Sequence, residues 1–118
     1  MTTDLLGKYS FGVGDRFAQQ GEAQLAAIRM AQERGIDVTP VWNKSHREHT
    51  IAKTEPIGTR RAADAAVAGL GWTGGYFVDA DHVTLETVGR FLDCSDYFTI
   101  DVADAIGRPA DPDAIGAF

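Results

Sequence analysis

The sequence has little of several features that would mark a specialised class of protein. A single cysteine, Cys94, excludes an internal disulfide and is typical of a protein from a reducing compartment. No apolar run approaches the ~20 residues that cross a membrane, and the first ten residues lack the apolar core of a signal peptide. No tract of Lys and Arg indicates nucleic-acid binding. We therefore expect a cytoplasmic protein without a nucleic-acid or membrane partner.

The composition that is present is ordinary for one folded domain. Hydrophobic residues make up 44% of the chain and charged residues 24%, which argues against disorder. The formal net charge is -6, from 17 acidic and 11 basic residues. A chain of 118 residues can bury one modest core but leaves little for a second domain.

Four short apolar runs alternate with stretches of helical spacing. The predicted strands lie within residues 8–14, 36–45, 75–81 and 96–104, and the predicted helices within residues 18–35, 55–71 and 84–95. Pro56 suits a first helical turn, Gly35 and Gly71 suit helix ends, and Thr84 is a candidate N-cap. Pro40 predicts a short or bulged second strand. Strand–helix alternation predicts an α/β fold of repeated βα units with parallel strands. Such units could form a small open sheet or the first half of a TIM-like (β/α)8 barrel, which needs roughly 250 residues.

Polar residues follow all four predicted strands. They are Asp15 and Arg16 after the first, Asn43 to His46 after the second, Asp79, Asp81 and His82 after the third, and Asp101 and Asp104 after the fourth. Active sites of parallel α/β folds gather at the carboxyl ends of strands. A single Asp could simply cap a helix, which stabilises a helix start by about 1 kcal/mol. Helix capping alone is a poor explanation for polar residues at all four strand ends, since these residues include His and Lys.

The third strand end offers a partial metal site. Alternation places Asp79 and Asp81 on the same side of the strand, with His82 beyond them. Carboxylates and imidazoles are the usual ligands of a catalytic divalent metal. From spacing alone, His82 could be such a ligand or an ordinary loop histidine.

Residues 41–56 predict a basic loop after the second strand. It is either a solvated surface loop or a site where Lys44, Arg47 or a histidine pairs with a carboxylate or phosphate. His46 and His49, three residues apart, would also suit metal binding if the loop were helical. Arg16 is a second candidate for anion binding.

Three further features favour structural roles. Gly12 and Gly14 lack the third glycine of a dinucleotide-binding loop. Cys94 has no neighbouring base or cation that would activate a thiol. Trp42 and Trp72 are expected to pack in the core.

Three long strings together resemble the hexuronate epimerase family, the tagaturonate/fructuronate epimerases. They are "KYSFGVGDRF", "GIDVTPVWNKSHREHT" and "ADAAVAGLGWTGGYFVDADHVTLETVGRFLDCSDYFTIDVAD", and the resemblance runs from about Lys8 to Ile106. Members of that family are several times longer and are thought to have a metal-dependent TIM-barrel-like fold. The resemblance implies that residues 1–118 are a single α/β unit, the N-terminal portion of a longer sugar-acid epimerase with a small-molecule hexuronate substrate.

The resemblance also implies a reaction and roles for residues. The two uronates differ at a carbon β to the ketone, so inversion requires retro-aldol cleavage and re-addition, with a divalent metal (zinc, manganese or nickel) and an acid/base. Class II aldolases use a consecutive Asp-His pair for this chemistry, and by analogy Asp81 is the acid/base and His82 the metal ligand. The substrate-binding residues expected with them are Arg16, Lys44, His49, Asp79 and Asp101.

Two alternatives stay open at this stage. A site that releases the retro-aldol fragments would be a class II aldolase-type lyase on a sugar acid. A chain this short could instead be a catalytically inert α/β module, forming a homo-oligomer or pairing through exposed sheet edges.

Overall fold

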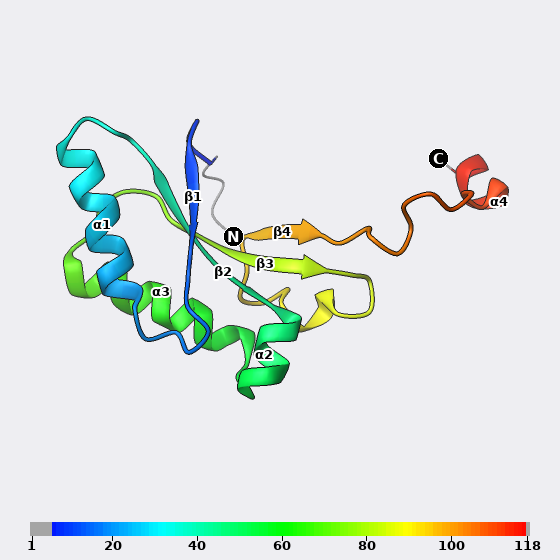
Figure 1. Cartoon of the computed structure of the whole chain (residues 1–118), viewed down its shortest axis with the longest axis horizontal. Helices are drawn as coiled ribbons and strands as arrows, with labels where there is room; N and C mark the ends of the chain where they lie inside the picture. The colour runs from blue at the N-terminus through cyan, green and yellow to red at the C-terminus, as the bar shows by residue number, and fades with distance from the viewer. Residues whose placement is uncertain (1–5, 118) are drawn as a thin grey trace.

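One sheet of four parallel strands forms the centre of the molecule, in a computed structural model that describes residues 6–117. The strands lie in the order β1-β2-β3-β4, and all three neighbouring pairs are parallel. Their bounds are β1 Ser10–Val13, β2 Thr39–Ser45, β3 Phe77–Val83 and β4 Tyr97–Ile100. Figure 1 shows the sheet with the helices that connect its strands. This arrangement confirms the predicted α/β fold with parallel strands.

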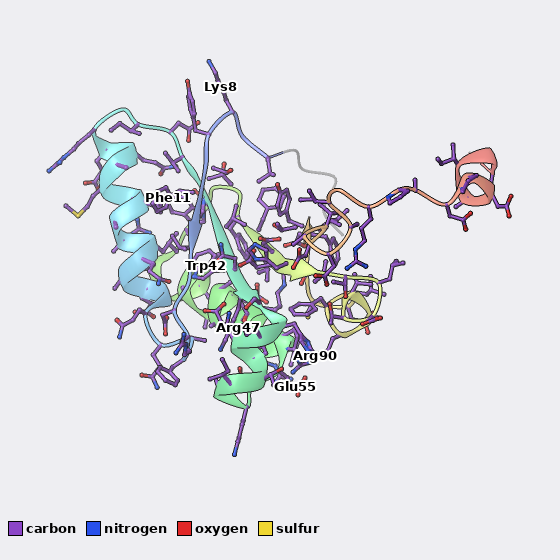
Figure 2. All side chains as sticks on the ribbon, turned by 45° about the vertical axis from the view of Figure 1, so that its right-hand side comes forward. Lys8, Phe11, Trp42, Arg47, Glu55 and Arg90 are labelled. Atoms are coloured by element: carbon purple, nitrogen blue, oxygen red, sulfur yellow. The ribbon has the colours of Figure 1, made fainter. Side chains whose placement is uncertain are left out.

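Helices α1 (Gly21–Glu33) and α3 (Pro56–Leu70) pack together and against the sheet. Their apolar residues meet those of β2 and β3 in one buried cluster: Leu25, Ile28, Trp42, Ala63, Ala66, Trp72 and Val78. Trp42 therefore lies inside the molecule (Figure 2), and both tryptophans have the predicted core role. Because side chains alternate along a strand, Asn43 and Asp79 point to the opposite face of the sheet.

The predicted ends of these helices are confirmed. Pro56 is the first residue of α3, where its missing N–H costs no hydrogen bond. Gly71 ends α3 with a left-handed φ of 60°, a conformation that glycine adopts without strain. Gly35 follows the end of α1 with φ 81°.

Pro40 sits inside β2 without breaking it, so the expectation of a short or bulged second strand is wrong. The N–H of Thr39 donates to the carbonyl of Tyr9, on the β1 side. The next backbone nitrogen, that of Pro40, points toward β3, whose pairing with β2 begins only at Val41. The missing N–H of Pro40 therefore leaves no gap in the ladder, and β2 continues to Ser45.

The basic stretch after β2 is a helix and not a loop. Helix α2 (His46–Ala52) begins directly after Ser45, which forms a capping box with Glu48. The hydroxyl of Ser45 accepts from the Glu48 N–H at 3.1 Å, and the Ser45 N–H donates to the Glu48 carboxylate at 3.0 Å. The prediction of a loop over residues 41–56 is therefore wrong.

The helix predicted over residues 84–95 is also wrong. This stretch forms turns around one short 3-10 helix, η1 (Val88–Arg90). Leu85 is 97% exposed, and Leu92 is exposed as well. Phe91 is buried instead, where it packs with Ala80 and Val83. The N–H of Thr84 donates to the Thr87 hydroxyl, so Thr84 caps no long helix. A short helix, α4 (Pro112–Gly116), lies apart from the sheet near the end of the chain (Figure 1).

Strand β3 contains a bulge before its end. Ala80 pairs with Phe98 and Val83 with Ile100, so Asp81 and His82 together face the single residue Thr99. His82 adopts a left-handed φ of 56°, which is uncommon for a residue with a Cβ. The extra residue returns Val83 to the same face as Ala80, where both join the cluster around Phe91.

Candidate active site

A hollow of about 660 Å³ lies at the carboxyl ends of the strands. Arg16, His46 and Arg47 line it on the side of β1 and β2. Asp81, His82 and Asp101 line it on the side of β3 and β4. The structure therefore brings together four of the residues predicted for the site: Arg16, Asp81, His82 and Asp101. The hollow is cationic on one side and carries carboxylates and an imidazole on the other.

His82 and Asp81 form a close pair within this hollow. The His82 Nδ1 lies 2.7 Å from the Asp81 Oδ1, and the imidazole is 62% exposed. A carboxylate at this distance accepts the Nδ1–H and fixes the ring orientation, which leaves the Nε2 lone pair free to bind a metal. The bulge and the left-handed φ of His82 turn the ring out at the end of the strand.

Asp101 and Arg16 are two further exposed residues of the site. The Asp101 N–H donates to the Val83 carbonyl at 2.9 Å, which holds Asp101 next to the end of β3. One oxygen of its carboxylate accepts the Ala103 N–H at 2.9 Å. The backbone carbonyl of Arg16 accepts from Lys44, while its guanidinium side chain reaches the hollow.

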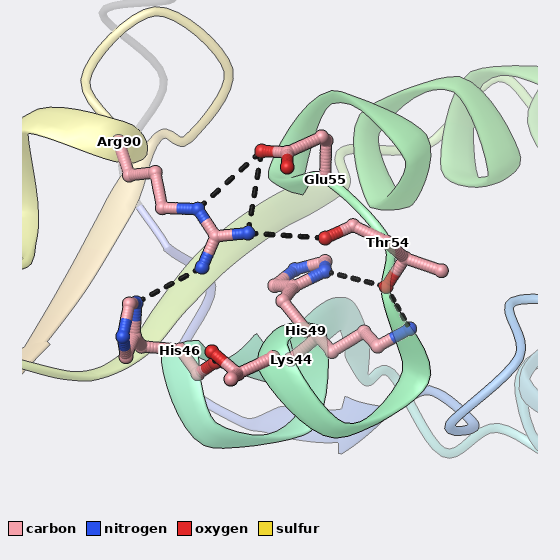
Figure 3. A network of polar contacts seen from close by, with 7 residues as sticks. Lys44, His46, His49, Thr54, Glu55 and Arg90 are labelled. Atoms are coloured by element: carbon pink, nitrogen blue, oxygen red, sulfur yellow. Dashed lines mark hydrogen bonds and ion pairs between the residues drawn. The ribbon is translucent and has the colours of Figure 1, made fainter.

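Arg90 connects three segments next to the hollow (Figures 2 and 3). Its guanidinium donates to the Glu55 carboxylate at 3.3 and 3.4 Å and to the Thr54 carbonyl at 3.1 Å. The Nη1 of Arg90 lies 3.0 Å from the His46 Nδ1. Sequence reasoning missed Arg90, because η1 gives no periodic signal and the contacts join residues far apart in the chain.

Two of the residues predicted to bind substrate are buried, Lys44 in β2 and His49 in α2. Lys44 is 2% exposed, and its ammonium donates to the Arg16 carbonyl and to the Thr54 hydroxyl. Burial lowers the pKa of Lys44. The His49 Nδ1 shares the same Thr54 hydroxyl at 2.9 Å (Figure 3), and burial, followed by the nearby Lys44 and Arg90, lowers the pKa of His49 to about 4. Neither side chain lines the hollow, and their substrate roles stay predictions.

Asp79 is also buried, on the face of the sheet opposite α1 and α3. Its two carboxylate oxygens accept from the Thr99 hydroxyl at 3.1 and 2.9 Å. Burial raises the pKa of Asp79, although the hydrogen bond from Thr99 opposes the rise. Asp79 thus links β3 to β4 next to Asp81 and does not line the hollow itself. Its predicted contact with substrate likewise stays a prediction.

Comparison with known proteins decides the family. The model of the UxaE family, described as tagaturonate epimerase, matches residues 3–112. The chain belongs to this family. No curated protein sequence matches the chain.

Two solved structures of a UxaE enzyme share the fold. Both are crystal structures of the fructuronate-tagaturonate epimerase UxaE from Cohnella laeviribosi, one with two glycerol molecules and one with a single glycerol. The first is 25% identical with a TM-score of 0.74, and the second is 27% identical with a TM-score of 0.72. The match covers 92% and 93% of this chain but only 22% and 21% of those chains. The chain therefore spans about a fifth of the length of these relatives.

The residues of this UxaE family member fit a divalent metal in part. The Nε2 of His82 is available as a ligand, and the Asp101 carboxylate lines the same hollow. Within residues 6–117, no three side chains of His, Cys, Asp or Glu lie close enough together to hold an ion. A complete metal site thus needs ligands in addition to those that the described residues bring together.

Two further observations concern Cys94 and the lengths of the helices. Cys94 is buried, donates to the Phe91 carbonyl at 3.6 Å, and has a pKa raised by burial, as expected for a thiol without a catalytic role. Among the described residues, no helix is both long and apolar enough to cross a membrane.

Proposed function

We propose that this chain supplies part of the active site of an isomerase that interconverts tagaturonate and fructuronate. The observation that carries the proposal is the two-sided hollow in a chain that belongs to the UxaE family. Arg16, Asp81, His82 and Asp101 come from the ends of three different strands and meet in one place. Such convergence at the carboxyl ends of parallel strands is the usual construction of an α/β active site.

The charge pattern of the hollow matches a sugar acid. The guanidinium groups of Arg16 and Arg47 suit the substrate carboxylate, which arginine binds through two parallel hydrogen bonds. On the other side, Asp81, His82 and Asp101 suit the hydroxyl and ketone end of the molecule. A ligand with one anionic end and several hydroxyls would therefore lie across the hollow from the β1–β2 side to the β3–β4 side.

Retro-aldol chemistry explains the inversion. A base removes the proton of the hydroxyl on the carbon β to the ketone, and the carbon–carbon bond between the α and β carbons breaks. The products are an aldehyde and an enediolate. After the aldehyde presents its other face, the enediolate carbon adds to it, and the alkoxide formed at the β carbon takes the proton back from the protonated base. A bound divalent metal would polarise the ketone and stabilise the enediolate charge.

Asp81 and His82 have separate roles in this proposal. Asp81 holds the His82 ring through Oδ1, and its Oδ2, without a hydrogen bond among the described residues, is the oxygen that takes the hydroxyl proton. The His82 Nε2 contributes one metal ligand. Because the four strands of the chain are all parallel and neighbours in the sheet are neighbours in the sequence, we infer that they form half of a (β/α)8 barrel. The remaining ligands would come from the rest of that barrel.

The first test is substrate binding to the 118-residue chain, followed by nuclear magnetic resonance of its backbone amides. With zinc present, tagaturonate should shift the amide signals around Arg16, Arg47 and His82. Tagatose, which lacks the carboxylate, should leave the Arg16 and Arg47 signals in place. Equal shifts with both sugars would exclude the assignment of Arg16 and Arg47 to the substrate carboxylate. The absence of any shift around the hollow with tagaturonate would overturn the proposal.

Product analysis on the same samples separates the enzyme classes. An epimerase converts tagaturonate only into another six-carbon acid, whereas a lyase releases two shorter fragments. In any preparation that turns over, Asp81→Asn should abolish conversion and retain metal binding, because the amide cannot accept the proton. Normal conversion by Asp81→Asn would refute its role as the base.

A further inference from the structure

We propose that Arg90 is a positioning residue that fixes His46 as a hydrogen-bond donor to the anionic end of the substrate. The inference rests on the proposed function and deepens it, since it adds His46 to the groups that recognise the sugar acid. It is carried by the contact between the Arg90 Nη1 and the His46 Nδ1 at 3.0 Å.

The chemistry of the two side chains determines the direction of this hydrogen bond. A guanidinium group carries only N–H donors. The His46 Nδ1 must therefore accept, and the proton of the neutral ring lies on Nε2. A ring with its proton on Nδ1 would place two N–H groups against each other. The tautomer of His46 thus follows from its neighbour.

Arg90 itself is held firmly enough to impose this choice. The Glu55 carboxylate and the Thr54 carbonyl accept from the other two nitrogens of the guanidinium (Figure 3). Both acceptors lie in the connection between α2 and α3. At the other end of the contact, the capping box of Ser45 and Glu48 fixes the backbone at His46. Both partners of the hydrogen bond are therefore anchored independently.

The remaining ring nitrogen of His46 is free for a ligand. His46 lines the same hollow as Arg16 and Arg47, and its Nε2 makes no hydrogen bond within residues 6–117. An N–H donor in a hollow that also contains two arginines adds directional recognition of a carboxylate, which has four lone-pair positions to fill. The Arg90 guanidinium at 3.0 Å makes a role as a cation ligand unfavourable for this histidine.

The test combines a tautomer measurement with a binding measurement. At about pH 8 the ¹⁵N signals of His46 should show the Nε2–H tautomer in the natural chain. Arg90→Ala should give a mixture of both tautomers and weaken tagaturonate binding by about twofold, because about half of the rings would then carry the proton on Nε2. His46→Ala removes the hydrogen bond altogether and should weaken binding by about tenfold, the size expected for one hydrogen bond to a charged group. Arg61→Ala, on the exposed surface of α3, is the matched control and should change neither.

Arg90→Lys is a second variant, used in case Arg90→Ala does not fold. Lysine retains the charge but cannot reach Glu55, Thr54 and His46 at once, so partial loss of tautomer preference is expected. An unchanged tautomer in both Arg90 variants, or unchanged tagaturonate binding by His46→Ala, would overturn the inference. Absence of all tagaturonate binding in the natural chain would instead overturn the proposed function, while the tautomer result would still report on Arg90.

Discussion

The three histidines of the chain occupy three different environments. His82 is largely exposed and paired with Asp81, whereas His46 lies beside Arg90 at the hollow. His49 is 1% exposed, lies 5.8 Å from the Phe91 ring, and has a buried Nε2 without a hydrogen-bond partner. Protonation of His49 would place a charge in this apolar setting next to Lys44 and Arg90. Its lowered pKa therefore makes it a source of acid sensitivity.

We predict that the free energy of unfolding decreases as pH falls from about 6.5 to about 4. In this window the unfolded chain protonates His49 and the folded chain does not, so protons favour unfolding. The full contribution amounts to about 3 kcal/mol. Urea unfolding at a series of pH values should show this loss in the natural chain and a much smaller one in His49→Gln.

His82→Gln serves as the control for that measurement, because its side chain is exposed. If the pH dependence of His49→Gln equalled that of the natural chain, the acid sensitivity would have to come from other groups.

At the residue scale, the sequence located the strand ends but not the direction of each side chain. Some of the polar residues after the strands line one hollow, namely Arg16, His46, Asp81, His82 and Asp101, whereas Asp15, Lys44, Asp79 and Asp104 do not. Lys44 lies two residues after the buried Trp42 in the same strand, so its side chain points to the same face of the sheet, toward the helices. Its charge alone would have suggested an exposed position. The roles of Thr54 and Arg90 depend on contacts between distant residues, which no local pattern encodes.

Helix α2 is the element that shapes the cationic side of the hollow. It is only seven residues long, and such a short helix depends on its cap and its packing. The reciprocal hydrogen bonds of Ser45 and Glu48 provide that cap. The sequence "SHRE" carries the capping-box spacing, which could have predicted the helix in place of a loop.

We predict that Ser45→Ala lowers the free energy of unfolding by about 1 kcal/mol, the usual effect of removing an N-cap side chain. The same change should loosen His46 and increase amide exchange in residues 46–52. Chemical denaturation and hydrogen exchange measure the two effects. Thr73→Ala, at an exposed position outside the helices and strands, should leave both unchanged. If Ser45→Ala lost no more stability than Thr73→Ala, the cap would be dispensable.

The helices whose ends are marked by Pro or Gly were predictable from the sequence, whereas the segment 84–95 was not. Pro56 and Gly71 mark the ends of α3, so its position followed from the sequence. Residues 84–95 have apolar residues at helical spacing, but Gly89 in the middle of the segment disfavours a helix. The segment also contains Phe91, which packs in the core. Burial of Phe91 against Ala80 and Val83 outweighed the weak helical pattern.

At the scale of the whole molecule, apolar side chains are exposed on β4 and on the segments that follow β4 and β3. Ile100 in β4 is 72% exposed, Val102 and Ile106 after it are 53% and 75% exposed, and Leu85 after β3 is 97% exposed. An apolar groove between β4 and the 84–88 segment includes Val88 and Phe98. Exposed apolar surface next to a sheet edge promotes association between chains.

We predict concentration-dependent self-association that Ile100→Lys reduces, because a charged side chain on an edge strand opposes pairing. Sedimentation velocity over a range of protein concentrations measures the effect. Glu33→Lys, on the exposed surface of α1 and away from β4, is the control and should associate like the natural chain. Identical sedimentation of Ile100→Lys and the natural chain would exclude β4 as the contact.

The bulge in β3 separates the proposed chemistry from the packing of the strand. Deleting either Asp81 or His82 would restore strict alternation and leave Val83 two positions after Ala80, on the same face toward Phe91. The second hydrophobic cluster therefore does not depend on the extra residue. A chain that lost this residue would keep that packing and lose the pairing of a carboxylate with an imidazole.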